Sequence, residues 1–529
     1  MEEDSAPAST LYTPDQQEDV RSLANGTGVS LAGSVSGRLI HALTDIWLAR
    51  LLGPGGFGIY SIGWNLHHLL YPFTSLGLPN STILFGVKYW KNDTVRFRGV
   101  FWAGTLALCI SGGITALLAW ISADWLALSV FGKPETAQII KTVGLMMPFF
   151  LILSNSSAMT RVTRRMQFSI ISNEIVSTVS MLAIFAILYW ISGQFWAVLV
   201  AMVVSYSLAA CIATIFVYRL FPELRQEFSG QLTQALKELL GFSIPTMLAG
   251  IFGASDLWLN RVLAGIFFPA EQVGLYQAAS QFNNLFGILL SSVVATFMPI
   301  IASLHQTGQT QRLNDLYKIT TKWSLYLNLP VVIVALLLPG DVMHFFYGTK
   351  YVQGAGLLVI LTIGQLINVG TGATTGLFLM TGRQHAYLKL TIASFILNIL
   401  GSIILIPYLG ISAMAVGQLL SSLCDNIFGT IWLAHDTGLW PYDARYLKGL
   451  LATGIAAAVI WWAPTLNVGP MLVFIWRSGL GLVAYAATLW LLKLDREDFE
   501  MLNSITSRAR GIFFKLPKNK AGQPTDEGK

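Results

Sequence analysis

Charge is scarce in this chain. Only 11% of its 529 residues are Asp, Glu, Lys or Arg, whereas 54% are hydrophobic. Soluble domains carry about 25% charged residues, so the composition excludes an ordinary water-soluble protein. Apolar runs of about 20 residues, each long enough to cross a bilayer as a helix, recur along the sequence. They lack the alternation of barrel strands and predict an all-α polytopic membrane protein.

Cysteine is also scarce, and the usual motifs of enzymes are missing. Cys109, Cys211 and Cys424 lie in apolar segments, without the paired spacing of a metal site or a disulfide framework. We expect all three to be buried packing residues. The chain has no glycine-rich nucleotide motif, nucleophile elbow or zinc-ligand spacing. We therefore expect no cofactor and no nucleic-acid partner.

The apolar runs predict fourteen transmembrane helices in two parallel six-helix lobes plus two extra C-terminal helices. The predicted parts are a cytoplasmic N-terminal tail (1–24), an N-lobe (25–220, helices 1–6), an amphipathic linker (221–240), a C-lobe (241–438, helices 7–12), helices 13 and 14 (439–493) and a basic cytoplasmic tail (494–529).

The basic residues predict the orientation. With these spans, 26 of the 33 Lys and Arg residues fall on one side, and only Lys133, Lys141 and Lys350 fall on the other. Cytoplasmic loops carry the excess of basic residues. Both termini are therefore predicted to be cytoplasmic in an integral cytoplasmic-membrane protein, and the opposite loops are short.

Two stretches six spans apart repeat each other. DIWLARLL at 45–52 and DLWLNRVL at 256–263 match at five of eight positions, and Gly-aliphatic-Tyr follows each, at 58–60 and 274–276. An even number of spans between copies gives parallel repeats, an arrangement that transporters use to rock two lobes around a central site.

The repeat region also resembles a known family. ARLLGPGGFGIYS (49–61) is similar to the first-loop signature of polysaccharide-export flippases, and LNILGSIILIPYLGISAMAVGQLLSS (397–422) to the pattern of their eleventh and twelfth helices. These flippases belong with drug/sodium antiporters and lipid II flippases in one superfamily. The resemblance implies a six-plus-six bundle that flips a lipid-linked oligosaccharide by alternating access, with helices 13 and 14 forming a groove for the lipid tail.

Ionisable residues in the first span share one face. Arg38, His41 and Asp45 are spaced i, i+3 and i+7, within about 60° of one another on a helix. Such residues usually face a cavity or a partner. The stripe predicts either the lining of a water-filled chamber or a local network that fixes helix packing. Arg50 lies on another face and is expected to reach the lipid headgroups, before a tight turn at Gly-Pro-Gly-Gly.

Polar side chains at helical spacing occur on several other spans, which suggests one shared wet interior. The further candidate cavity residues are Trp64, His68, Tyr71, Asp256, Asn260, Arg261, Tyr276, Asn283, Gln365, Asn368, Gln418 and Asp425. Cations suit the phosphates of a polyprenyl phosphate or pyrophosphate carrier, whereas amides, hydroxyls and aromatic faces suit sugars. Asp45, Asp256 and Asp425 are candidate carriers of a coupling cation or proton.

The function predicted from these features is a flippase for a lipid-linked oligosaccharide or polysaccharide repeat unit. One alternative is a cation-coupled multidrug antiporter, although such proteins typically have twelve helices. Another is a membrane-embedded glycan polymerase or glycosyltransferase. Those enzymes generally need a sizeable extracytoplasmic loop with catalytic residues, and the longest predicted loop here is about fifteen residues.

Overall fold

The computed structural model describes the backbone of residues 14–163, 165–226, 232–464 and 469–492, and these residues form helices and no strand. The chain divides into two compact units, residues 1–442 and 443–529, which are described separately below. The predicted C-terminal tail beyond residue 493 lies outside the described residues. The first helix begins at Pro14, within the predicted N-terminal tail.

The first helix, α1 (Pro14–Ser75), contains both of the first two predicted spans. It breaks at Gly53, whose φ of 68° and ψ of 174° are not helical. That combination of angles is essentially restricted to glycine. Pro54 follows directly and suits the first turn of the next helical segment, since its φ is fixed near the helical value. The predicted four-residue turn is therefore wrong: one glycine makes the break, and residues 54–56 are helical.

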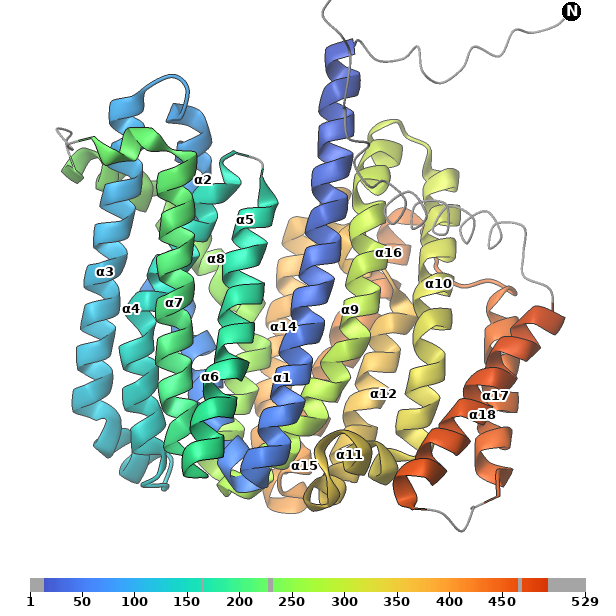
Figure 1. The fold of residues 1–529 in the computed structure, drawn as a ribbon. Helices are drawn as coiled ribbons and strands as arrows, with labels where there is room; N and C mark the ends of the chain where they lie inside the picture. The colour runs from blue at the N-terminus through green and yellow to red at the C-terminus, as the bar shows by residue number, and fades with distance from the viewer. Residues whose placement is uncertain (1–13, 164, 227–231, 465–468, 493–529) are drawn as a thin grey trace, which may run out of the picture. The chain divides into compact units, whose positions relative to one another are not determined.

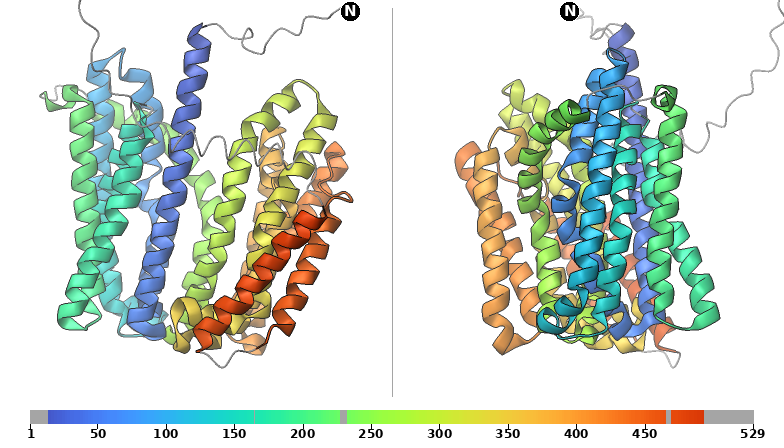
Figure 2. Two further views of the ribbon diagram at one scale, coloured as in Figure 1. Left: turned by 45° about the vertical axis from the view of Figure 1, so that its right-hand side comes forward. Right: turned by 90° about the vertical axis from the view of Figure 1, so that its left-hand side faces the viewer.

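The rest of the first half follows the predicted spans closely. Its helices are α2 (Leu78–Tyr89), α3 (Thr94–Trp125) with a π-helical end, η2 (Leu126–Val130), α4 (Thr136–Arg161), α5 (Met166–Ile170), the π-helix η3 (Ile171–Val176), α6 (Ser177–Ser192), α7 (Trp196–Leu220) and the 3₁₀ turn η4 (Pro222–Arg225). Helices α3, α4 and α7 pack side by side (Figure 1), and Figure 2 shows this part of the first unit from two further sides.

The predicted linker does not form a separate helix in its described part. Helix α8 (Leu232–Phe267) runs without a break through the predicted boundary at residue 240. Leu239 is fully buried in a cluster with Phe85 and Phe97 of α2 and α3. Glu238 accepts a hydrogen bond of 2.5 Å from the Tyr89 hydroxyl. One face of this segment therefore packs on the first half, whereas Thr233, Gln234 and Lys237 at other positions are exposed.

Several predicted spans of the second half are interrupted. The elements are α9 (Ala270–Gln306), α10 (Thr310–Leu337), α11 (Pro339–Tyr347), the 3₁₀ turn η5 (Thr349–Gly354), α12 (Ala355–Thr371), α13 (Thr374–Met380), α14 (Gln384–Leu409), α15 (Ser412–Ser422), the π-helix η6 (Leu423–Phe428) and α16 (Gly429–Thr437). The tenth predicted span breaks at Gly372, which has a φ of 65°. The twelfth span contains η6 in its middle.

The two repeated segments meet at their glycines. A Cβ atom on Gly58 would lie 1.8 Å from the carbonyl oxygen of Ala270, and one on Gly274 would lie 2.0 Å from that of Pro54. Both Ala270 and Pro54 stand four residues before the glycine of their own repeat. The contact is therefore reciprocal between α1 and α9, and it requires the absence of a side chain at both glycines.

The second unit contains α17 (Tyr446–Trp462) and α18 (Pro470–Leu491), which pack against each other. Gly481 of α18 lies against Ile460, where a Cβ would come within 2.5 Å of its side chain. Arg477 donates two hydrogen bonds to the Ile460 carbonyl, at 3.1 and 2.9 Å. A close glycine contact and a side-chain-to-backbone bond thus join this pair.

Large apolar side chains are exposed on many helices, as expected where lipid is the solvent. Trp190 is 88% exposed and Ile121 is 68% exposed. Among the described residues, eight helices are long and apolar enough to cross a membrane, so the count of fourteen spans stays a prediction. The expectation for the cysteines is wrong in part, since only Cys424 is buried and Cys211 is exposed on the apolar helix α7.

Candidate functional site

A central cavity of about 590 Å³ lies within the first unit, between α1 and parts of both predicted lobes. It brings together six of the predicted residues: Arg38, His41, Asp45, Trp64, His68 and Arg261. The polar stripe on α1, Arg38, His41 and Asp45, therefore borders a cavity. The same lining includes residues that the sequence reasoning did not select: Asn173, Glu174, Ser177, Tyr206, Trp258, Gln277, Gln281 and Asn284.

Asp45 is the centre of a polar network on one wall of this cavity. Its side chain is buried, and its Oδ2 atom accepts a 2.7 Å hydrogen bond from Nε2 of Gln281 on α9. His41 Nδ1 lies 3.6 Å from the same oxygen. The carboxylate thus joins α1 to α9 and lies beside His41, so the stripe both borders a cavity and contacts a neighbouring helix.

Aromatic rings line another wall and join α1 to α8. The His68 ring stacks on Trp258, with ring centroids 4.0 Å apart and planes 13° from parallel. The Arg261 guanidinium lies 5.2 Å from the centre of the same indole. Arg261 is only 3% exposed, and a cation over an aromatic face is stabilised electrostatically. Burial of a guanidinium here is offset by the ring and by the polar cavity.

Glu174 adds a second carboxylate to the central cavity. It lies in η3, a π-helical turn at the start of the fifth predicted span. Such turns are frequent at functional sites because the extra residue redirects side chains. Gly37 of α1 approaches it closely, since a Cβ there would lie 2.7 Å from the Glu174 Cβ. An acid at the start of an apolar run was the signal in the sequence that could have found it.

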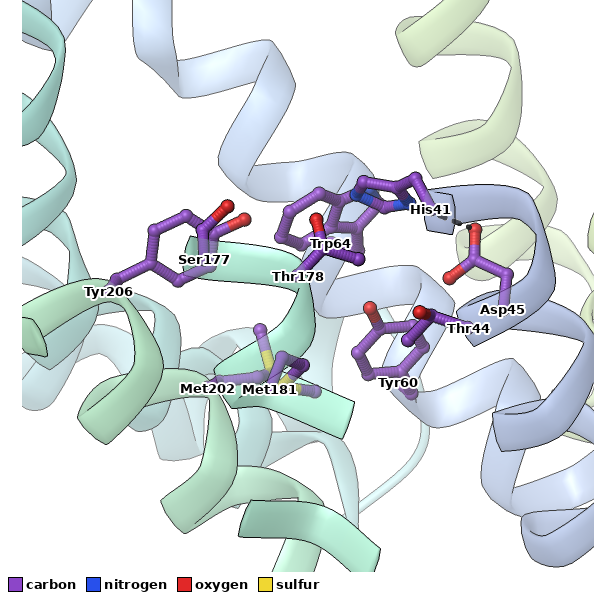
Figure 3. Close-up of a pocket in the computed structure, with 10 residues that line it drawn as sticks. All are labelled: His41, Thr44, Asp45, Tyr60, Trp64, Ser177, Thr178, Met181, Met202 and Tyr206. Atoms are coloured by element: carbon purple, nitrogen blue, oxygen red, sulfur yellow. Dashed lines mark ion pairs between the residues drawn. The ribbon is translucent and has the colours of Figure 1, made fainter. Parts of the chain in front are cut away.

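A small side pocket of about 20 Å³ extends the cavity beside Asp45. Figure 3 shows His41, Trp64 and Asp45 of α1 on one side, and Ser177 with Tyr206 across from them. Thr44 and Tyr60 also border it. A volume of about 10–15 Å³ suffices for one water molecule, so this recess accommodates a single water beside the carboxylate.

A second polar cavity, of about 210 Å³, lies within the predicted C-lobe. We call it the C-lobe chamber. It brings together the predicted residues Asn283, Gln365, Asn368, Gln418 and Asp425, with Asn426, Ser421, Ser422, Thr375 and Tyr387 beside them. The single wet interior expected from the sequence is thus divided into two cavities, because α9 stands between the residues of the two groups.

Hydrogen bonds from neighbouring side chains hold the chamber residues in place. Ser394 of α14 donates a 2.5 Å bond to Asp425. The Tyr276 hydroxyl donates to Gln418 Oε1 at 3.2 Å, and Asn368 donates to Gln365 Oε1 at 3.4 Å. Asp425 belongs to η6, so each polar cavity receives a carboxylate from a π-helix.

Three predicted residues have mainly packing contacts. The Tyr71 hydroxyl lies 2.7 Å from Ser154 Oγ of α4. Asn260 is buried and donates to the Met414 carbonyl at 3.0 Å, while Ser402 donates to its Oδ1 at 3.2 Å. Tyr276 is 1% exposed, and its hydroxyl donates a hydrogen bond to the chamber residue Gln418. Asp256 lies in α8, and its side chain is outside the described residues.

Arg50 takes a different partner from the one expected. Instead of simply reaching outward, its Nε donates to the Phe346 carbonyl at 2.7 Å, and its Nη2 donates to the Phe345 carbonyl. These carbonyls belong to the last turn of α11, where a cation complements the negative end of the helix dipole. The nearby Tyr351 hydroxyl donates to the Ala49 carbonyl at 2.8 Å. The segment before the Gly53 break is thereby tied to the second half.

Known proteins with similar sequences are flippases and capsule proteins. The chain is 22% identical to the lipid II flippase MurJ of Bacillus subtilis over 489 residues, covering 83% of this chain and 88% of that protein. It is 21% identical to the probable flippase AglR of Haloferax volcanii over 451 residues, covering 83% and 89% respectively.

Solved structures with the same fold are membrane transporters. A lipid II flippase MurJ in an inward closed conformation matches with a TM-score of 0.69 and 13% identity, covering 88% of this chain and 98% of that one. An inward-facing multidrug resistance MATE transporter matches with a TM-score of 0.61 and 15% identity, covering 76% and 94%. These likenesses confirm the predicted all-helical transporter fold.

Two families match the sequence directly. Residues 258–404 match the MatE family, and this range lies within the predicted C-lobe. Residues 23–305 match the family described as polysaccharide biosynthesis protein, which is more than half of the chain. Both matches include the α8 segment that carries Trp258 and Arg261. This chain belongs to the polysaccharide biosynthesis protein family.

Proposed function

We propose that this protein is a flippase that moves a lipid-linked oligosaccharide or polysaccharide repeat unit across the cytoplasmic membrane. The observation that carries the proposal is the central cavity. Arg38 of α1 and Arg261 of α8 both line it, together with aromatic rings. Guanidinium groups bind phosphate oxygens with charge-assisted bonds, and aromatic faces accept sugar rings. The relatives named as flippases support the same function for the whole chain.

The transport step proposed is alternating access between two lobes of six helices. The reciprocal contact of Gly58 and Gly274 supports a twofold relation between the lobes, since each repeat glycine meets the partner repeat at the same position. The contacts of Arg50 and Tyr351 join α1 to α11 and η5 near the Gly53 break. We assign this end to the extracytoplasmic side and both termini to the cytoplasm, from the distribution of basic residues.

In this proposal the lipid tail stays in the bilayer while the head group crosses through the central cavity. The carrier is a polyprenyl phosphate or pyrophosphate. A coupling cation or proton would bind at the pair of His41 and Asp45, whose neighbours in the cavity lining include the charged or titratable groups of Arg38, Glu174, His68, Tyr206 and Arg261. The role is that of a transporter, with no chemical change to the glycan.

Reconstituted flipping tests the proposal. Proteoliposomes would contain a polyprenyl pyrophosphate that carries a fluorescent oligosaccharide, and a membrane-impermeant quencher would report the leaflet of the label. We expect flipping by the native chain and loss of about tenfold or more for Arg38→Ala and for Arg261→Ala, since a hydrogen bond to a charged group contributes about 1.5–3 kcal/mol. Arg312→Ala, at an exposed position in the first turn of α10, is the matched control. Native rates in both cavity variants would contradict the proposal.

The MatE match favours one alternative, a cation-coupled multidrug antiporter. The two functions differ in what must occupy the central cavity. A drug antiporter would export an organic cation such as ethidium from loaded vesicles when an opposing sodium or proton gradient is applied. Under our proposal, ethidium release from such vesicles equals that from empty liposomes. Gradient-dependent release that requires Asp45 would favour the antiporter.

A further inference from the structure

Two turns of the first unit repeat each other in sequence. Phe131-Gly132 precedes α4, and Tyr347-Gly348 follows α11, 216 residues later, which is also the interval between the two repeat glycines of α1 and α9. Gly132 has a φ of 60° and Gly348 a φ of 98°, values that favour glycine. Both aromatic rings are buried. Each predicted lobe thus has an aromatic-glycine turn, and we call residues 131–133 the N-turn and residues 347–351 the C-turn.

The N-turn donates a hydrogen bond to the end of a helix in the other predicted lobe. Nζ of Lys133 lies 2.5 Å from the carbonyl oxygen of Gly265, in the last turn of α8. The ordinary helical donor for this carbonyl would be the N–H of residue 269, which is a proline and has none. A cation also complements the negative end of the helix dipole. Phe131 packs on the same place, since a Cβ on Gly265 would lie 3.5 Å from its ring.

The C-turn makes the matching bond in the opposite direction. The Tyr351 hydroxyl donates to the Ala49 carbonyl at 2.8 Å. Ala49 lies in the last helical turn of α1 before the break at Gly53, where backbone carbonyls lose their helical donors. Tyr351 is 1% exposed, so this bond is buried. Each aromatic-glycine turn therefore supplies a donor to the end of the first membrane-spanning segment of the other predicted lobe.

Similar side chains nearby make bonds that stay within one predicted lobe. Lys141 pairs with Asp124 at 2.9 Å, and both residues belong to the predicted N-lobe. The Tyr189 hydroxyl donates at 2.9 Å to the carbonyl of Leu51, two residues after Ala49, and these residues too belong to the predicted N-lobe. The chain thus offers a lysine and a tyrosine whose bonds do not cross the lobe boundary.

We propose that Lys133 and Tyr351 are positioning residues that form a reciprocal latch between the lobes, at the end of the bundle near the Gly53 break. This inference rests on the proposed flippase function and adds the residues that hold one end of the transport path closed. When the lobes separate at this end, the Gly265 and Ala49 carbonyls lose these donors. Because an unpaired buried carbonyl is costly, water must take the place of the donors. The latch therefore opens towards water.

Distances from pulsed electron spin resonance, measured on the full chain in nanodiscs, test the latch. Genetically encoded spin-labelled residues would replace Gln138 and Gln272, which are exposed near the starts of α4 and α9 in different predicted lobes. Lys133→Met and Tyr351→Phe should each raise the ratio of longer to shorter distances about fivefold over the native chain, because each removes a hydrogen bond between the lobes. Lys133→Arg keeps a donor and should restore the native distribution.

Lys141→Met and Tyr189→Phe are the matched controls, because they remove bonds within one lobe. We expect both to keep the native distribution of distances. An unchanged distribution in both Lys133→Met and Tyr351→Phe would overturn the inference, and so would an equal shift in the two controls. If Lys133→Met does not fold, Tyr351→Phe still decides. The measurement contains no glycan, so failure of the latch is distinguishable from failure of the flippase proposal, which the flipping rates of the two arginine variants test.

Discussion

The central cavity and the C-lobe chamber are both polar spaces among membrane-spanning helices, yet they differ in charge. The central cavity is lined by Arg38 and Arg261 as well as Asp45 and Glu174, so both signs are present. The charged side chain in the described lining of the chamber is Asp425, among amides and hydroxyls. A carboxylate on a π-helix reaches each space. Among the described lining residues, the difference therefore lies in the cations, which border the central cavity.

The two spaces also stabilise their buried polar groups differently. An ionisable residue in a membrane-spanning helix costs at least ~2.5–3.5 kcal/mol at the bilayer centre. In the central cavity, opposite charges and an aromatic ring offset this cost, as Arg261 over Trp258 shows. In the chamber, neutral donors such as Ser394 do so. Substitutions that remove a charge or an aromatic ring from the central cavity should therefore differ in effect from substitutions that remove a neutral donor from the chamber.

The largest effect is expected from reversing a charge in the central cavity. Arg261→Glu replaces a phosphate-binding cation by a repelling carboxylate, and should reduce flipping of a pyrophosphate-linked glycan about 100-fold or more. The same carboxylate in the chamber, as Gln365→Glu, should reduce flipping of a neutral glycan by only about tenfold. The quencher assay in proteoliposomes measures both. Equal losses would contradict the assignment of the phosphates to the central cavity.

The network around Asp45 should give the next largest effect. Gln281→Leu removes the 2.7 Å bond to Asp45 and leaves a buried carboxylate with less compensation. We expect about a tenfold loss of flipping, because an unsatisfied buried group costs about 1–3 kcal/mol. Asn284→Leu, at an exposed position on the same helix and cavity, is the comparison. A greater loss in Asn284→Leu than in Gln281→Leu would contradict the importance of this bond.

The aromatic wall should contribute less. Trp258→Leu removes the stack with His68 and the ring beneath Arg261. Aromatic pairs contribute about 0.5–1.5 kcal/mol beyond their area, so we expect a loss of about two- to tenfold in flipping rate. Trp190→Leu, at an indole that is 88% exposed, should leave the rate unchanged. An unchanged rate in Trp258→Leu would show that the aromatic wall does not contribute to transport.

The smallest effect on rate is expected in the chamber when shape is kept. Asp425→Asn should change flipping of a neutral glycan by less than about threefold, since the amide still accepts the bond from Ser394. The quencher assay in proteoliposomes measures this rate. A loss of about tenfold or more would show that transport needs the charge of Asp425.

The sequence predicts much of the fold because lipid imposes simple rules. Apolar runs locate the helices, and the repeated Gly-aliphatic-Tyr locates a contact that only glycine permits, at Gly58 and Gly274. The spacing of Arg38, His41 and Asp45 places them on one face, and the structure puts all three in one cavity. Local patterns suffice for such features because the residues that form each pattern lie within a single helix.

Other features depend on how helices meet, and the sequence alone does not predict them. The division into two cavities follows from the position of α9, where Gly287 lies against Gln365. The partners of Arg50 lie about 295 residues away, in α11. Glu174 stands near the start of an apolar run, where an acid is easily taken for a loop residue. Its place in the cavity comes from a π-helical turn that periodicity of 3.6 residues does not represent.

The most direct test of the central claim is binding of substrate without transport. Native mass spectrometry of the full chain would measure retention of a polyprenyl pyrophosphate oligosaccharide by the native protein, the Arg38→Ala/Arg261→Ala double variant, and Asp425→Asn. We predict that the double variant loses the ligand while Asp425→Asn retains it at the native level. Retention by the double variant at the native level would contradict the claim that the central cavity holds the phosphates.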